Sequence, residues 1–237
     1  EYFTSVGSTT AQKAHDLSVA HNLNFDFSLG GKELTNNLCH TFQLHEVSQQ
    51  EVERVIKHFP SNKAPGYDKI SARVLRDGLS AILPVVTHIM NNCHSSNTFA
   101  KVWKIAEVAP ILKSGDIEDP GICRPISLLP ILSKVSERLV HGQLVKCFTE
   151  NEKLSKKTQG GNRKLHSTET ALLHVTDKLL KAMDEKKIFV VVLLDMSKAF
   201  DSIRHDLLLQ KLETLGVFPS TEWFKSYLSN RYQYVRV

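Results

Sequence analysis

One apolar segment constrains the fold more than any other feature of the chain. Residues 188–194 read IFVVVLL, and the next residue is Asp195. A membrane-spanning helix needs about 20 apolar residues, so this run is too short to be one. It is rich in β-branched residues, and a continuous apolar run of this length is typical of a strand buried on both faces. We therefore expect residues 188–194 to form a fully buried strand that ends at Asp195.

Asp195 is the most informative single residue, because that strand would deliver its carboxylate to the edge of the core. An ionised carboxylate in such a place needs a partner or a metal ion. A metal ligand beside a cleft is the functional interpretation, and an Asp that caps a strand-to-helix turn is the simpler one. A third interpretation is a phosphoacceptor at the end of an α/β strand. It requires alternating parallel βα units, and only one convincing buried strand is predicted.

Composition indicates a folded and basic protein. Hydrophobic residues make up 41% of the 237 residues, which is enough for a packed core. The net charge of +5 and the isoelectric point near 9.0 favour contact with polyanions. The four cysteines are far apart and form no Cys-x-x-Cys pair, which argues against a zinc site or a disulfide framework. We expect reduced thiols, an intracellular location and no membrane segment.

The N-terminal region, residues 1–45, is mixed and polar. Gly30-Gly31 and Asn36-Asn37 interrupt any periodic pattern, so we expect a linker or a loosely docked arm. The chain begins with Glu1 and has no basic stretch followed by an apolar one. This predicts the absence of a secretory signal and a chain cut from a longer protein.

Helix and hairpin signals fill the rest of the chain. Ser48 is a candidate N-cap and Glu51 completes a capping box, which predicts a helix that begins after Ser48 and ends before Pro60. Residues 106–113 and 122–129 are extended on either side of an acidic turn, which predicts a β-hairpin. Apolar periodicity predicts further helices at residues 71–78, 80–93, 131–149, 167–186 and 205–215, the last of them stopped by Gly216.

Six short motifs carry a resemblance to a known family. Residues 190–205 (VVVLLDMSKAFDSIRH) resemble the first palm motif of reverse transcriptases from non-long-terminal-repeat (LINE-type, jockey-like) retrotransposons. Five other matches occur in the family's order: residues 63–68 (KAPGYD), 109–113 (APILK), 124–130 (RPISLLP), 166–172 (HSTETAL) and 223–231 (WFKSYLSNR). Any one of them could arise by chance, but six in order form a specific signal.

The resemblance implies an α+β right-hand polymerase fold that is incomplete. Residues 46–165 would form the fingers subdomain and residues 166–237 the first part of the palm, after the linker or arm at residues 1–45. The family's later aromatic-x-Asp-Asp hairpin is expected to be missing, since the sequence contains no Asp-Asp pair. The palm sheet would then lack partner strands for residues 188–194.

The resemblance also implies roles for individual residues. Asp195 would be the first catalytic carboxylate of a site that binds two Mg²⁺ ions, with a contact from the backbone carbonyl of Met196. Phe200 would exclude a ribose 2′-hydroxyl, and an ordinary core aromatic is the alternative. Lys113 and Arg124 would grip the triphosphate of a deoxynucleotide, and solvated hairpin charges are the alternative.

A basic cluster could track the phosphates of the RNA template and DNA primer that the family binds. Its members are Lys156, Lys157, Arg163 and Lys164, and a solvated loop is the equal alternative. Asn162 stands between Gly161 and Arg163 where relatives have an aromatic residue, which puts template handling in doubt there. We interpret Asp201, six residues beyond Asp195, as a structural residue at a helix start or in a turn.

The leading functional prediction is RNA-directed DNA polymerisation by the parent protein, a retrotransposon reverse transcriptase found in the nucleus and cytoplasm. One carboxylate cannot hold two divalent cations, so we expect this chain to be inactive alone. The rival hypothesis is a non-catalytic nucleic-acid-binding remnant of such an element. It agrees with the missing Asp-Asp pair and with Asn162.

Overall fold

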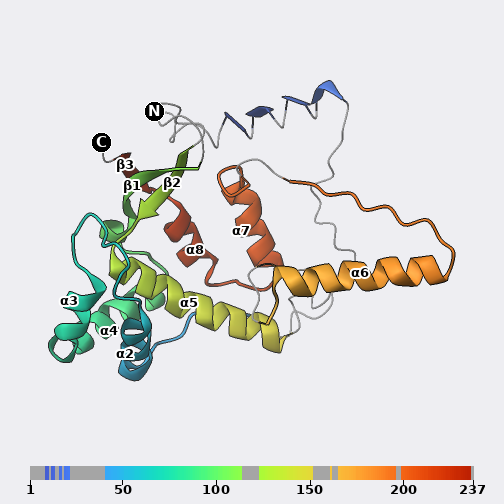
Figure 1. Ribbon diagram of the computed structural model, residues 1–237. Helices are drawn as coiled ribbons and strands as arrows, with labels where there is room; N and C mark the ends of the chain where they lie inside the picture. The colour runs from blue at the N-terminus through green and yellow to red at the C-terminus, as the bar shows by residue number, and fades with distance from the viewer. Residues whose placement is uncertain are drawn as a thin grey trace.

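Helices build most of the fold, and one small sheet lies at one end of it (Figure 1). The computed structural model describes residues 9–10, 12–13, 16–17, 19–21, 41–113, 123–151, 161, 165–195 and 199–235. The elements, in chain order, are α2 (Gln49–His58), α3 (Ala72–Asp77), α4 (Leu79–Ser95), the 3₁₀ helix η1 (Lys101–Lys104), β1 (Ile105–Leu112), β2 (Cys123–Leu128), α5 (Ile131–Glu150), α6 (Thr168–Asp184), α7 (His205–Thr214), α8 (Thr221–Leu228) and β3 (Tyr232–Val235). This mixture agrees with the expected α+β class.

Local capping signals determine where several helices start. The Ser48 hydroxyl accepts a hydrogen bond from the Glu51 amide, and the Glu51 carboxylate accepts one from the Ser48 amide, so the predicted capping box is confirmed. Ser167 caps α6 in the same way through Thr170. After α7 the chain turns at Gly216, whose φ of 82° is favourable only for glycine. The predicted helices are confirmed to within a few residues.

The core lies where α2, α4 and α5 meet. Val52 and Ile56 of α2, Met90 of α4 and Val135 of α5 are at most 1% exposed. Trp223 of α8, which is 2% exposed, extends this core. Its indole stacks on the Tyr227 ring at 5.5 Å and meets the Phe99 ring edge-on at the same distance.

The sheet has the strand order β2-β1-β3. β1 and β2 form the antiparallel hairpin that the sequence predicts, with Glu107 opposite Leu128 and Ile111 opposite Arg124. β3 adds to the other edge of β1 in parallel, with Ile105 opposite Tyr232. The sequence did not predict β3, because a four-residue strand carries little periodicity and its partner lies more than a hundred residues earlier in the chain.

Residues 41–48, named here the strap, connect α4 and α5 through hydrogen bonds to their side chains. Side-chain amides hold its backbone: Asn91 of α4 accepts from and donates to the backbone of Val47, and Gln143 of α5 does the same for His45. Phe42 and Leu44 of the strap are buried. Phe42 and Leu44 thus belong to the packed core, although they lie inside the region expected to be a linker or arm.

The prediction of a buried strand at residues 188–194 is wrong. These residues, all of which the structure describes, form no strand, and Ile188 and Leu194 are 95% and 89% exposed. A strand needs a hydrogen-bonding neighbour. β1 is already paired on both edges, and residues 188–194 pair with neither β2 nor β3. Without a neighbouring strand, residues 188–194 remain exposed and outside the sheet, so their apolar content alone did not make them a strand.

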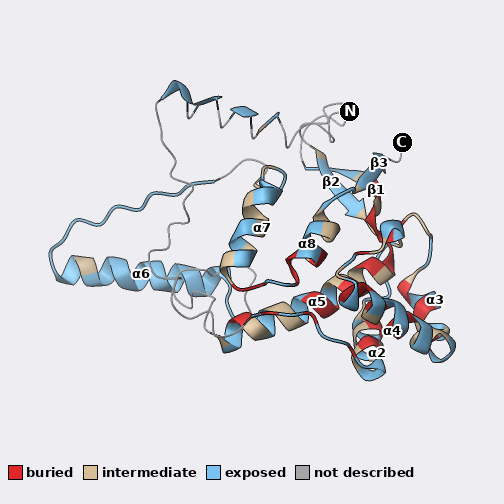
Figure 2. Cartoon of the chain, turned by 180° about the vertical axis from the view of Figure 1, so that it is seen from behind, coloured by how far each residue is buried: buried red, intermediate tan, exposed pale blue. Residues whose placement is uncertain are grey.

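The molecule thus contains two regions of different character. The packed region, residues 41–113, 123–151 and 205–235, holds every buried side chain of the described residues. The exposed arm, residues 168–195, consists of α6 and the extended segment after it, and none of its residues is buried (Figure 2). No described helix has the length and apolar character that crossing a membrane requires.

Candidate functional site

The hairpin brings two predicted site residues to one place. Ile111 and Arg124 are opposite each other in the ladder, so their side chains lie on the same face of the sheet. Lys113 follows the end of β1 two residues after Ile111, and strand periodicity directs it to that face too. Lys113 and Arg124 are both exposed. The tip of the hairpin therefore presents an ammonium and a guanidinium together, a pair that can bind a phosphate.

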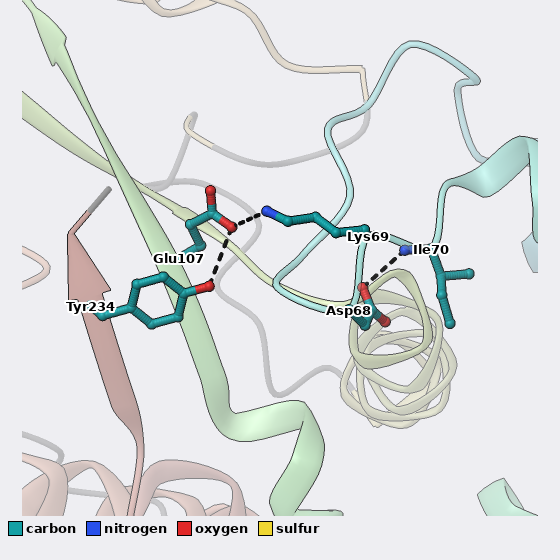
Figure 3. A network of polar contacts seen from close by, with 5 residues as sticks. All are labelled: Asp68, Lys69, Ile70, Glu107 and Tyr234. Atoms are coloured by element: carbon teal, nitrogen blue, oxygen red, sulfur yellow. Dashed lines mark hydrogen bonds and ion pairs between the residues drawn. The ribbon is translucent and has the colours of Figure 1, made fainter. Parts of the chain in front are cut away.

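A buried carboxylate anchors the inner half of this hairpin (Figure 3). Glu107 is the third residue of β1, and its side chain is only 3% exposed. Its Oε2 atom accepts hydrogen bonds from the Lys69 ammonium at 2.5 Å and from the Tyr234 hydroxyl at 3.3 Å. The loop before α3, the central strand and β3 are thereby joined at one atom. We name this contact the Glu107 junction.

Sequence reasoning did not identify the Glu107 junction. The available signal was a single charged residue within the apolar run Ile105–Val108, since a buried charge needs a partner. The identity of that partner was not readable, because Lys69 and Tyr234 come from distant parts of the chain.

Two of the six motifs pack directly against each other. A side chain on Gly66, in the motif at residues 63–68, would place a Cβ atom 2.3 Å from the backbone nitrogen of Pro130, in the motif at residues 124–130. Only glycine fits this close approach. The Tyr67 hydroxyl also donates a hydrogen bond to the carbonyl of Val102, just before β1. These contacts fix the 63–68 loop against the base of the hairpin.

A second polar cluster joins α8 to α5. The Tyr227 hydroxyl donates a hydrogen bond to the Glu137 carboxylate at 3.3 Å, and the Arg231 guanidinium lies 4.7 Å from the centre of the Tyr227 ring. Burial raises the pKa of Glu137, and it raises the pKa of Tyr227 to about 12 with a further contribution from the Glu137 charge. Lys104 donates to the carbonyl of Ser226. The motif at residues 223–231 is thereby held against the helix that follows the hairpin.

The predicted catalytic residues are not assembled with the hairpin. Asp195 ends the exposed arm and is itself exposed, and Phe200 is 84% exposed. Asp201 lies in an exposed turn. Among the described residues, no group of three or more His, Cys, Asp or Glu side chains could hold a metal ion. Within the described part of the chain, Asp195 therefore belongs to no group of three or more such side chains.

Five predicted site residues lie outside the described part of the chain. They are the metal-contact candidate Met196 and the four members of the basic cluster, Lys156, Lys157, Arg163 and Lys164. Their roles stay predictions.

Comparison with known proteins decides the family. Residues 111–237 match the family model for reverse transcriptase (RNA-dependent DNA polymerase), which is more than half of the chain. The chain belongs to the reverse transcriptase family. The assignment from the six motifs is confirmed, and the matched segment contains the hairpin tip, Asp195 and the motif at residues 223–231.

Two relatives place this reverse transcriptase chain among retrotransposon proteins. It is 36% identical over 189 residues to a probable RNA-directed DNA polymerase from transposon BS of Drosophila melanogaster, covering 79% of this chain and 21% of that protein. It is also 36% identical over 197 residues to the RNA-directed DNA polymerase from mobile element jockey of Drosophila melanogaster, covering 82% of this chain and 21% of the relative. The chain spans about a fifth of the length of these curated relatives.

Proposed function

We propose that this chain is the fingers and the first part of the palm of an RNA-directed DNA polymerase from a non-long-terminal-repeat retrotransposon. The parent protein extends a DNA primer on an RNA template with deoxynucleoside triphosphates. The observation that carries the proposal is the family match over residues 111–237, which includes the hairpin tip, β2 and Asp195. The names of the BS and jockey relatives support it.

Lys113 and Arg124 bind the triphosphate in this proposal. Their shared face at the hairpin tip supports the role, because a planar guanidinium can hold two phosphate oxygens while an ammonium neutralises a third. The Glu107 junction and Gly66 hold the inner half of the hairpin, so the tip projects from a fixed base. Phe200 supplies the steric exclusion of ribonucleotides.

The described residues do not fit a complete two-metal site. Such a site divides the charge of two Mg²⁺ ions among several carboxylates, and Asp195 is one exposed carboxylate outside any cluster of three. In our proposal Asp195 and the carbonyl of Met196 supply part of the site, and acidic residues of a longer polymerase supply the rest. The isolated chain does not polymerise.

A chimera tests this proposal. Residues 46–237 would replace the matching segment of the jockey polymerase, to which the chain is 36% identical. We expect Mg²⁺-dependent extension of a DNA primer on an RNA template, lost in Asp195→Asn and kept in the matched control Asp201→Asn. Phe200→Ala should admit ribonucleotides. A folded chimera that binds template and primer without extending them, or extension that survives Asp195→Asn, contradicts the proposal.

The rival function is a nucleic-acid-binding remnant without catalysis. Its support is that Asp195 is exposed and lies outside any three-membered acidic cluster of the described residues. In that case RNA binding by the isolated chain survives Asp195→Asn and fails when Lys156, Lys157, Arg163 and Lys164 are neutralised, while the chimera stays inactive.

A further inference from the structure

Lys69 has a backbone conformation that its residue type disfavours. Its φ is 57°, in the left-handed region where glycine is usual and where the Cβ atom of other residues approaches a carbonyl oxygen. Two hydrogen bonds form the turn around it: the Lys69 amide donates to the carbonyl of Gly66 at 3.0 Å, and the Ile70 amide donates to the Asp68 carboxylate at 3.3 Å. Residues in disfavoured conformations concentrate at functional positions. A lysine in this turn therefore indicates that its side chain is used.

The Lys69 side chain extends from the turn to the central strand of the sheet (Figure 3). Its ammonium, on a side chain that is 61% exposed, donates to Oε2 of Glu107 at 2.5 Å. An ion pair between two exposed groups contributes little, but this carboxylate is only 3% exposed and needs a donor. The same Oε2 atom accepts from the hydroxyl of Tyr234, which is opposite Glu107 in β3. Lys69 thus connects the turn at residues 66–69 to the Glu107 junction.

The outer half of the hairpin depends on the inner half for support. β3 pairs with β1 along residues 105–108 only, and in the described part of the chain residues 109–112 pair with β2 alone. Residues 106–108 are buried, whereas residues 110–112 are exposed. The orientation of the tip is therefore set where the buried half is held.

The Glu107 junction and the tip cations lie on one face of the sheet. Glu107, Ile111 and Lys113 are separated by even numbers of residues, and Arg124 is opposite Ile111. At about 3.3 Å per residue, the tip lies about 20 Å from the junction. A tilt of about 10° at the junction displaces the tip by about 3–4 Å, which exceeds the length of a hydrogen bond. A small movement at the junction is therefore large at Lys113 and Arg124.

We infer that Lys69 is a positioning residue for the triphosphate of the incoming nucleotide. By holding Glu107, it keeps the hairpin in the orientation in which Lys113 and Arg124 reach the triphosphate. Without Lys69 the hairpin samples other orientations, and the apparent nucleotide affinity falls with the competent fraction. The inference rests on the proposed function, because it takes Lys113 and Arg124 as the groups that bind the triphosphate. It adds a role in nucleotide affinity for the turn before α3.

Lys69→Gly in the jockey chimera is the decisive variant, because glycine readily adopts the φ of 57° and lacks the ammonium. Primer extension is measured with dTTP on a polyadenylate template and an oligothymidylate primer. We expect KM for dTTP to rise by about tenfold, for a competent fraction of about one tenth, while kcat changes by less than about twofold. If Lys69 only shaped the turn, glycine would serve as well and KM would stay unchanged. Loss of folded enzyme lowers the rate without raising KM, so this split separates positioning from stability.

Lys186 provides the matched control. It also has a left-handed φ, of 53°, and it lies just after α6 in the exposed arm. Lys186→Gly should keep the wild-type KM. Lys69→Arg keeps a cation within reach of Glu107, so its KM should stay within about twofold of wild type. Glu107→Gln should raise KM as Lys69→Gly does, and the two changes together should raise it no further.

Hydrogen exchange in the 237-residue chain tests the coupling without catalysis. Amides of residues 105–112 and 123–128 should exchange faster in Lys69→Gly than in wild type or in Lys186→Gly. Equal exchange rates in all three proteins would overturn the inference.

The kinetic outcomes separate this inference from the proposed function. A chimera that extends primers and keeps its KM in Lys69→Gly overturns the positioning role and leaves the proposed function standing. An equal rise of KM in Lys186→Gly overturns it too, because the effect would then not be specific to the Glu107 junction. A folded wild-type chimera without activity overturns the proposed function and the positioning role with it.

Discussion

The packed region and the exposed arm both contain a helix that starts with a capping box, but only in the packed region are the apolar side chains buried. Helices α2 and α6 both start at a serine with a capping box. Val52 in α2 is fully buried, whereas Leu172 in α6 is 66% exposed. Local signals therefore suffice to start a helix, and burial requires a partner surface. Each of the following predictions compares a residue of the packed region with a matched residue of the arm.

The largest difference is expected for apolar side chains. Trp223→Ala should lower the free energy of unfolding by about 3–5 kcal/mol, because it leaves a cavity among stacked rings. Leu172→Ala, on the exposed face of α6, should change it by less than about 0.5 kcal/mol. Urea unfolding followed by far-ultraviolet circular dichroism measures both. A loss in Leu172→Ala as large as that in Trp223→Ala would mean that α6 is packed in solution.

The next largest difference is expected for two Lys–Glu pairs that are both 2.5 Å long. Glu107→Gln disturbs a carboxylate that is 3% exposed and accepts from Lys69 and Tyr234, so it should cost about 1–3 kcal/mol. Lys69 is 61% exposed and can be rehydrated, which limits the loss. Glu185→Gln, on the arm, should cost less than about 1 kcal/mol. Equal urea midpoints for the two variants would show that the Glu107 junction contributes no stability.

The same contrast explains how much of the molecule the sequence predicts. The hairpin and the helices were predictable because their signals are local: the capping box at Ser48, the apolar stripe of α2 and the acidic turn between β1 and β2. The strand predicted at residues 188–194 was wrong because apolar content does not say which strand will pair with it. β3 was missed because its short sequence does not reveal that it pairs with β1, a strand from a distant part of the chain.

The residues of the candidate site also differ in whether local sequence could predict their placement. Lys113 and Arg124 could be placed together because hairpin register follows from adjacent sequence. Glu107 was missed because its partners Lys69 and Tyr234 come from other parts of the chain. Asp195 was singled out by the apolar run before it, the family resemblance supplied its catalytic role and that of Phe200, and these roles stay predictions. Resemblance identifies residue types in order, but their assembly depends on surfaces that the motifs do not describe.

The two capping serines allow a smaller comparison. Ser48→Ala should lower the free energy of global unfolding by about 1 kcal/mol, because α2 lies in the core and its cap is lost with the fold. Ser167→Ala removes the same kind of cap from α6, where the helix can fray without unfolding the core. Its urea midpoint should stay at the wild-type value, while amide hydrogen exchange accelerates within α6. A shifted midpoint in Ser167→Ala would couple the arm to the packed region.

The smallest effect at neutral pH is expected at a buried histidine. His94 is 2% exposed, its Nδ1 atom donates to the carbonyl of His45, and burial lowers its pKa below the ordinary value of 6.5. The unfolded chain therefore binds a proton more readily than the folded one. The resulting stability is fully present above about pH 6.5 and declines as the pH falls through the lower folded pKa.

His94→Gln should make unfolding less sensitive to acid, and His174→Gln on the exposed face of α6 should not. The measurement is the urea midpoint of each protein at several values between about pH 7 and pH 5, a window that brackets the ordinary histidine pKa of about 6.5. Other titrating groups, including Glu137 with its raised pKa, are shared by all three proteins. The difference between the pH profiles therefore isolates the substituted histidine. Parallel profiles for wild type and His94→Gln would show that His94 takes up its proton without unfolding the core, and the contrast between the two regions would then not extend to protonation.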